Sequence, residues 1–215
     1  MMTGEAADFY FDPVSPFAFL AWRLLRRDGF PRRVRPVPIV LAAVLDHWGQ
    51  RGPAEIPPKR LVTYRHCLWL AGRHGIEMRF PPVHPFRSLE ASRLIVSLGA
   101  TPAAVDAIFQ AIFVEGHDLG APDVMETLCA QLGLPGASPL TVPAVKDGLR
   151  ANTDIAIAHG VFGVPTLIVD GETFWGVDAL DMAREYCANP EMFRMPDMKR
   201  LEAVDQGGQR KVKAT

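Results

Sequence analysis

A short apolar strand that leads, through a proline-framed serine, straight into a helix is the feature that most constrains the fold of this chain. Residues 8–12 are predicted to form a buried strand, and residues 16–28 carry apolar side chains at the i, i+3, i+4 spacing of a helix. Ser15 and Pro16 stand at the junction, where serine is a favoured N-cap and proline a favoured first helical residue. The sequence therefore predicts a hydroxyl at the N-terminus of a helix that directly follows a strand.

Further strands and helices are predicted in a regular order along the chain. Residues 34–40 are predicted to form a second strand, and the two prolines within it indicate an edge or irregular position. A helical block follows between proline and glycine breaks, with helices expected over residues 61–74, 88–98, 102–114, 122–132 and 144–159. Strand character then returns at 165–169 and 173–175, around an Asp-Gly hairpin signal, and a last helix is expected over 178–187.

This order, β-α-β, a helical block and then β-β-α, predicts the fold class. It is the order of an α/β fold in which a thioredoxin-like domain carries a large inserted all-helical domain. We expect a discontinuous thioredoxin-like domain at residues 6–44 and 160–188, a helical insertion domain at 45–159, and a C-terminal tail at 189–215 that runs over the surface.

Composition narrows the classes of function. Lys and Arg number 23 against 24 Asp and Glu, a formal net charge of -1, which argues against a nucleic-acid partner. The sequence has no apolar run of about 18 residues, and its start lacks the basic and apolar regions of an export signal. We therefore expect a cytoplasmic protein without a membrane segment.

Cysteine and histidine spacing gives expectations about redox and metal chemistry. Cys67, Cys129 and Cys187 lie far apart, form no C-x-x-C pair and leave an odd one over, which predicts buried free thiols. The histidines include no pair at metal-ligand spacing, so we expect no metal site.

Ser15 occupies the place where thioredoxin-like oxidoreductases carry C-x-x-C. Residues 15–18 are Ser-Pro-Phe-Ala, so the chain supplies no redox thiol there. The free N–H groups and positive dipole end of a helix N-terminus stabilise a thiolate, which must then come from a bound cofactor. Ser15 is predicted to donate a hydrogen bond to that sulfur and lower its pKa. An equally weighted alternative is that Ser15 only caps the helix.

Val164 and Pro165 form a second candidate element. In this fold, an X-Pro bond before a strand that faces the first helix is the usual place for a cis peptide. The backbone of Val164 would then be open to a peptide ligand, which pairs with it as an added short strand. The alternative is an ordinary trans proline at a strand start.

Three segments carry a family resemblance: residues 8–21, 160–169 and 174–178. They resemble the 2-hydroxychromene-2-carboxylate isomerases and the related kappa-class glutathione transferases, and the resemblance extends over nearly the whole chain to about residue 187. It implies a thioredoxin-like, DsbA-like fold, glutathione as cofactor and a homodimer.

The resemblance also implies roles for individual residues. Ser15 matches the serine that contacts the glutathione sulfur, and Val164, with Pro165, matches the site of backbone pairing to the cysteinyl part. Val177 and Asp178 match the turn that holds the γ-glutamyl end. Two further positions match cofactor-binding residues: Gln50, where relatives carry Asn, and Lys59.

The chain departs from the family pattern at other positions. His66 stands where Asp is usual, Trp69 where Arg is usual, and Ala179 where many relatives have Arg. These losses of charge indicate a changed substrate, weaker glutathione binding or rearranged partners.

The implied substrate is a small aromatic carboxylate held between the first helix and the helical insertion. Phe17, Trp48 and Pro53 are candidate apolar walls, although core packing is the more common role of an aromatic residue. Arg87 is a candidate for the substrate carboxylate, against the more common alternative of a solvated side chain.

The resemblance favours a glutathione-dependent isomerase of the 2-hydroxychromene-2-carboxylate type, acting in the degradation of aromatic compounds. A kappa-like glutathione transferase or peroxidase is the alternative. The departures at Gln50, His66 and Ala179 leave open a non-catalytic thioredoxin-fold binding protein.

Overall fold

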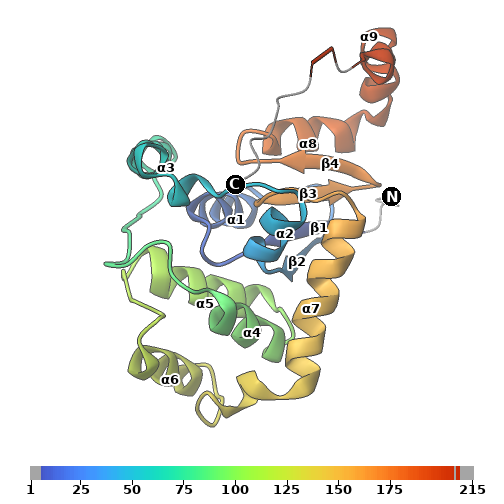
Figure 1. Ribbon diagram of the computed structural model, residues 1–215. Helices are drawn as coiled ribbons and strands as arrows, with labels where there is room; N and C mark the ends of the chain where they lie inside the picture. The colour runs from blue at the N-terminus through green and yellow to red at the C-terminus, as the bar shows by residue number, and fades with distance from the viewer. Residues whose placement is uncertain (1–5, 206, 209–215) are drawn as a thin grey trace.

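The computed structural model describes residues 6–205 and 207–208 and is built on one mixed sheet. The sheet contains β1 (Ala7–Phe11), β2 (Val34–Pro38), β3 (Thr166–Val169) and β4 (Glu172–Trp175) in the order β2-β1-β3-β4. β1 is parallel to β2 and antiparallel to β3, which is antiparallel to β4 (Figure 1). The proline-bearing strand β2 lies at an edge, as predicted, because proline lacks the N–H that a central strand must donate.

Alternation along β1 sends its side chains to two separate cores. Phe9 and Phe11 enter the larger core, shared with α1 (Pro16–Asp28) and α8 (Leu180–Ala188). Tyr10 enters the smaller core on the other face, with residues of α2 (Leu41–His47) and α7 (Pro143–Ala158). The sheet is thus covered on both faces, and its two layers of helices come from distant parts of the chain.

The helical block contains the helices predicted from periodicity. They are α3 (Pro57–Arg73), α4 (Leu89–Ser97), α5 (Pro102–Phe113), α6 (Pro122–Gln131) and α7, with two short 3-10 turns, η1 (Pro53–Glu55) and η2 (Ser138–Thr141). α3 begins at Pro57, several residues before its predicted start, because proline is well tolerated in the first turn of a helix. α2 was not predicted from the sequence, because seven residues are too few to show a helical period.

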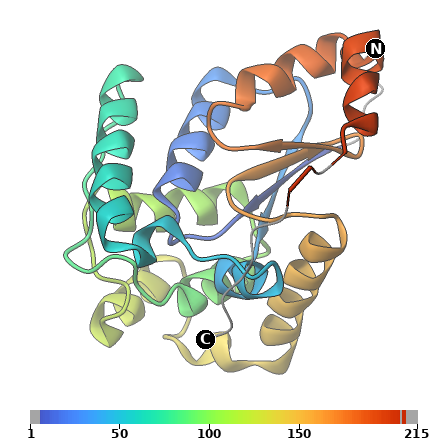
Figure 2. The ribbon, with the colours of Figure 1, turned by 45° about the horizontal axis from the view of Figure 1, so that its top comes forward.

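The helical block packs directly on the sheet and on α1. The ring of Phe109 on α5 lies 5.6 Å from that of Phe11 and 5.9 Å from that of Phe19. The indole N–H of Trp22 donates to the carboxylate of Asp106 at 2.6 Å. α3 runs beside α1 (Figure 2). The thioredoxin-like fold with a helical insertion is therefore confirmed, while the predicted domain boundaries stay a prediction.

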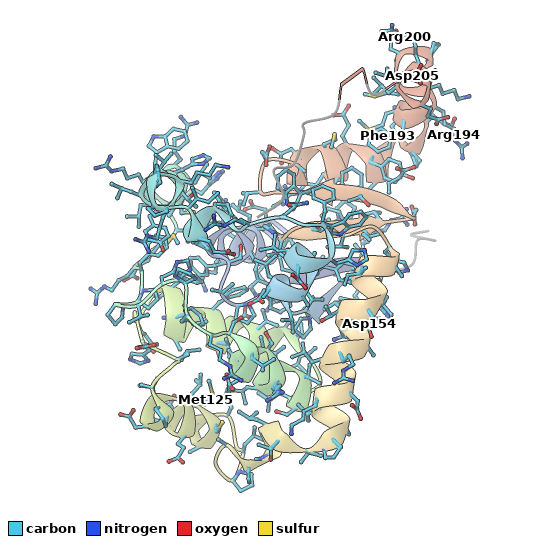
Figure 3. The ribbon with its side chains drawn as sticks, viewed as in Figure 1. Met125, Asp154, Phe193, Arg194, Arg200 and Asp205 are labelled. Carbon is cyan, nitrogen blue, oxygen red and sulfur yellow. The ribbon has the colours of Figure 1, made fainter. Side chains whose placement is uncertain are left out.

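The segment predicted to be a tail contains short helices. These are η3 (Pro190–Arg194), α9 (Pro196–Arg200) and η4 (Leu201–Ala203). Phe193 lies beside α8, with its ring 5.2 Å from that of Tyr186 and 5.8 Å from that of Phe174 (Figure 3). Contact with the larger core thus orders the start of a segment in which the sequence predicted no helix. The remainder of the predicted tail, 206 and 209–215, lies outside the described residues.

All three cysteines are free, as predicted. Cys67 and Cys129 are also buried, as predicted, whereas the prediction of a buried thiol was wrong for Cys187, which is partly exposed near the end of α8. Burial raises the pKa of the Cys67 thiol to about 12, because the charged form is disfavoured away from water. Within residues 6–205 and 207–208, no helix is long and apolar enough to cross a membrane, and no cluster of His, Cys, Asp or Glu suits a metal ion.

Candidate functional site

Ser15 caps α1 and keeps its hydroxyl proton available. Its Oγ accepts a hydrogen bond from the N–H of Ala18 at 3.2 Å, and its backbone is extended, with φ -84° and ψ 115°. A hydroxyl both accepts and donates, so this cap uses an oxygen lone pair and leaves the O–H free. No acceptor for that proton is found among the described residues. Capping and donation to a ligand are therefore compatible roles.

The first turn of α1 offers a second polar group at the same place. Pro16 has no N–H, and the N–H of Ala18 is taken by the cap, which leaves the N–H of Phe17 without an acceptor in the described part of the chain. An unsatisfied N–H at the positive end of a helix dipole favours an anion. The arrangement can thus stabilise a thiolate that lies against the helix N-terminus.

A carboxylate that sequence analysis missed, Asp12, holds the turn before Ser15. Asp12 is only 2% exposed, and its carboxylate accepts from the N–H of Val14 at 3.0 Å and from the N–H of Leu41 at 2.8 Å. Burial raises the pKa of the Asp12 carboxyl, and hydrogen bonds from Ser88, Val14 and Leu41 oppose that rise. In the sequence, the signal for this residue was an acidic side chain at the end of an apolar predicted strand, three residues before Ser15.

The Val164–Pro165 peptide is cis, as predicted, and precedes β3. Tyr10 pairs with Thr166 in the antiparallel register, so the end of β1 lies beside the cis proline. The carbonyl of Pro165 accepts from the N–H of Gly176 at 2.9 Å, which joins this loop to the turn after β4. The sheet thus brings together three segments that are far apart in the sequence.

The indole of Trp175 covers the loop before the cis peptide. A Cβ at position 163 would lie 2.9 Å from its Nε1, so glycine at that position permits the close approach. The ring of Phe162 lies 5.1 Å from that of Trp175, which is 54% exposed. The two aromatic residues form an apolar border on the cis-proline side of the site.

Asp178 presents an open carboxylate next to the cis-proline loop. It is exposed, and no ion pair to it is found within the described ranges. Its Oδ1 lies close to Gly176, whose φ of +97° is a conformation that glycine adopts easily. Val177 packs against the larger core and fixes this turn. Asp178 is thus held in place and free to bind a cationic group.

The other predicted cofactor residues lie on the surface. Gln50 follows α2 and Lys59 lies in the first turn of α3, and both are exposed. The structure places Lys59 on the helix that packs beside α1 and gives it no ion pair among the described residues. Among the described residues, neither Gln50 nor Lys59 forms a hydrogen bond with Ser15.

The predicted substrate residues differ in their surroundings. Phe17 is half-buried, with its ring 5.6 Å from that of His66 on α3. Trp48 is 45% exposed, and its indole N–H donates to the carbonyl of Val161 at 2.9 Å. The side chain of Arg87, just before α4, is 73% exposed and pairs with Glu90 in the first turn of that helix at 3.4 Å, and an exposed ion pair of this kind is weak.

Two cavities lie away from Ser15. One of about 400 Å³ is bordered by Asp8, His159 and Asp170 at the start of β1, and one of about 300 Å³ is bordered by Tyr10, Arg35 and Asn152. Neither cavity is lined by Ser15, by the cis-proline loop or by Asp178. We therefore base the candidate site on Ser15, the cis-proline loop and Asp178.

The fold and this site define a thioredoxin-like protein with Ser15, and no C-x-x-C pair, at the start of α1. Residues 6–188 match the family of the DSBA-like thioredoxin domain. The chain is 32% identical over 188 residues to the 2-hydroxychromene-2-carboxylate isomerase of Pseudomonas putida, covering 81% of this chain and 90% of that protein. It is 25% identical over 214 residues to the glutathione s-transferase kappa 2 of Caenorhabditis elegans, covering 88% and 95%.

A solved structure of a 2-hydroxychromene-2-carboxylate isomerase is also similar, with a TM-score of 0.72 and 25% identity over 92% of this chain and 98% of that one. The chain belongs to the DsbA-like thioredoxin family and, within it, to the group of 2-hydroxychromene-2-carboxylate isomerases and kappa-class glutathione transferases. These relatives support an enzyme of isomerase or transferase type.

The raised pKa of Asp12 predicts a pH-dependent difference in stability between the wild type and Asp12→Asn. Between the ordinary pKa of about 3.9 and the higher folded value, the folded protein binds more protons at this site than the unfolded chain. Protonation of Asp12 therefore stabilises the folded state at low pH, and this contribution to the free energy of unfolding is lost as the pH rises through the folded pKa. Urea unfolding from about pH 4 to pH 7 should show the free energy of unfolding of wild type, relative to Asp12→Asn, falling with pH. A difference that rises with pH would mean that the hydrogen bonds to the carboxylate outweigh its burial.

Proposed function

We propose that this protein is a glutathione-dependent isomerase of the 2-hydroxychromene-2-carboxylate type, with Ser15 donating a hydrogen bond to the cofactor sulfur. The observation that carries this proposal is the Ser15 hydroxyl at the N-terminus of α1, whose oxygen accepts from Ala18 and whose O–H has no acceptor among the described residues. Glutathione, when bound, would supply a nucleophilic thiolate beside the Ser15 hydroxyl, and a thiolate there is suited to reversible addition to a conjugated substrate.

The residues of the chain suit three parts of that tripeptide: the γ-glutamyl ammonium, the cysteinyl part and a carboxylate. Asp178 has the charge to bind the γ-glutamyl ammonium, and Val177 holds the turn that carries it. The backbone of Val164, followed by cis Pro165, is available to pair with the cysteinyl part as a short added strand. Lys59 has the charge to bind a carboxylate, and Gln50 keeps the amide function of the Asn in relatives. These side chains bind and orient, and they place the sulfur against the helix N-terminus.

The substrate we propose is a small aromatic carboxylate in a degradation pathway for aromatic compounds. Phe17, on α1, and Trp48, at the end of α2, have partly exposed rings that could pack against an aromatic substrate. Arg87 is already paired with Glu90, so it must exchange that partner to bind the substrate carboxylate. The cytoplasmic location expected from the sequence stays a prediction, which fractionation of the producing cells tests.

A kappa-like glutathione transferase is the second candidate, favoured by the similarity to the kappa 2 protein. The two activities share the cofactor and differ in whether glutathione leaves unchanged or leaves joined to the product. Mass analysis of products after incubation with glutathione and a hydroxychromene carboxylate separates them. A protein that binds no glutathione would instead match the third alternative, a non-catalytic binding protein.

Replacing Ser15 with alanine should raise the pKa of the bound glutathione thiol by about one to two units, because hydrogen bonds to charged groups contribute about 1.5–3 kcal/mol. The ultraviolet absorbance of the thiolate, followed against pH in the enzyme complex, measures this. Thr101→Ala is a matched control, since Thr101 caps α5 through a 3.3 Å bond from the N–H of Ala104, away from the site. Equal thiol pKa values in wild type and Ser15→Ala would contradict the proposed role.

Replacing Asp178 with asparagine should weaken glutathione binding about two- to five-fold, a modest effect because the carboxylate is exposed. Calorimetric titration measures the dissociation constant. Cysteinylglycine lacks the γ-glutamyl group, so its affinity should be the same for wild type and variant. A loss that is equal for both ligands would show that Asp178 supports the turn and does not bind the γ-glutamyl end.

The homodimer implied by the resemblance is part of the proposal, and the surface of α3 supports it. Leu61, Val62, Leu68 and Trp69 are 45–65% exposed on this one helix, and a clustered apolar surface of this kind marks protein interfaces. We propose that a second copy of the chain binds to this surface.

Leu68→Asp should shift the sedimenting species from dimer to monomer, because the charge lies within the proposed interface. Val204→Asp, at another exposed apolar position, should leave the sedimenting species unchanged. A monomeric wild type would refute the homodimer.

A further inference from the structure

The peptide that joins Val14 to Ser15 is held at both ends by hydrogen bonds. Its N–H, that of Ser15, donates to the carbonyl of Asp12 at 2.9 Å. Its carbonyl, that of Val14, accepts from Nε2 of His84 at 2.7 Å. The orientation of this peptide plane sets the backbone torsion angles on either side of it, and hence the direction in which the Ser15 side chain leaves the backbone.

The hydrogen bonds of His84 define its tautomer. Nε2 must carry a proton to donate to a carbonyl, so in the neutral ring Nδ1 is an acceptor. The hydroxyl of Tyr64 on α3 lies 2.6 Å from that Nδ1 and 2.8 Å from the His84 carbonyl. Burial lowers the pKa of the His84 imidazole, which favours the neutral ring. The single hydroxyl proton of Tyr64 is shared between these two acceptors, and an Nδ1 that accepts keeps the proton of the neutral ring on Nε2, directed at Val14.

Aromatic rings enclose His84 and restrict its rotation. Its ring lies 5.4 Å from that of Phe80, 6.1 Å from that of Phe86 and 6.2 Å from that of Phe113. An apolar side chain would pack in such surroundings without the cost of burying two ring nitrogens. The polar ring is therefore explained by its bonds to Val14 and Tyr64, which connect the helical block to the turn before Ser15.

We propose that His84 is a positioning residue for Ser15: through the Val14 carbonyl it fixes the peptide plane that aims the Ser15 hydroxyl, and Tyr64 fixes the tautomer of His84. The role in catalysis rests on the proposed function of Ser15, whereas the positioning itself is a property of the protein without ligand. The two can be measured separately.

Three variants separate the hydrogen bond from the packing of the ring. His84→Gln keeps an N–H donor at nearly the reach of Nε2, His84→Leu keeps apolar volume and loses the donor, and Tyr64→Phe loses only the hydroxyl. Amide hydrogen exchange of Ala18, whose N–H bonds to Ser15 Oγ, reports the position of Ser15 without ligand. We expect about ten-fold faster exchange in His84→Leu, near wild-type exchange in His84→Gln, and an intermediate rate in Tyr64→Phe.

The same proteins are then tested with glutathione. The pKa of the bound thiol should rise by about half a unit to one unit in His84→Leu and return to within about 0.3 units of wild type in His84→Gln. Unchanged Ala18 exchange in His84→Leu, or equal changes in His84→Leu and His84→Gln, would overturn the positioning role. If wild type does not lower the thiol pKa, the proposed function of Ser15 fails, and the exchange rates alone then support or overturn the role of His84.

Discussion

The buried carboxylate of Asp12 is the contact on which the geometry around Ser15 depends. It accepts the N–H of Val14 within its own turn and the N–H of Leu41 at the start of α2, so it joins two loops that leave neighbouring strands. Both loops gain from such a partner, because the N–H groups of Val14 and Leu41 are partly buried and an N–H away from water without an acceptor is costly. Burying a carboxylate is also costly, and hydrogen bonds from backbone donors offset part of that cost. The turn is therefore held in a single arrangement at the point where β1 ends.

The register of the sheet supplies the other half of the site. β1 and β3 are antiparallel, so the end of β1 meets the start of β3, and the cis proline comes to lie beside the turn that Asp12 holds. The bond from Gly176 to the Pro165 carbonyl extends the same arrangement to Asp178. One strand pairing thus places three loops together, although more than 140 residues of helical and strand structure separate the first loop from the other two.

Local signals in the sequence predicted the helices and strands well, because proline punctuation and apolar spacing act within a few residues. α5 begins at Pro102 and α6 at Pro122, as the sequence predicted. The same reasoning missed α2, which is short, and the helices after Pro190, which begin where Phe193 reaches the larger core. It also missed His84, since its partners, Val14 and Tyr64, lie 70 and 20 residues away in the chain. Such contacts depend on tertiary structure and leave no local pattern.

The cap of α1 explains how one serine can serve both stability and chemistry. Ser15 Oγ turns a lone pair toward the N–H of Ala18, and this limits the directions in which its O–H can donate a hydrogen bond. A hydroxyl does not ionise near neutral pH, so the helix dipole cannot generate a nucleophile from Ser15 itself, as it does from cysteine in redox relatives. In the proposed function, a ligand that brings its own acidic thiol would meet the O–H of Ser15 and the N–H of Phe17 in the same place. Ser15 is only 7% exposed, so a larger capping residue would add atoms at the place proposed for the sulfur. Serine therefore combines the smallest hydroxyl side chain with the orientation that the helix end imposes on it.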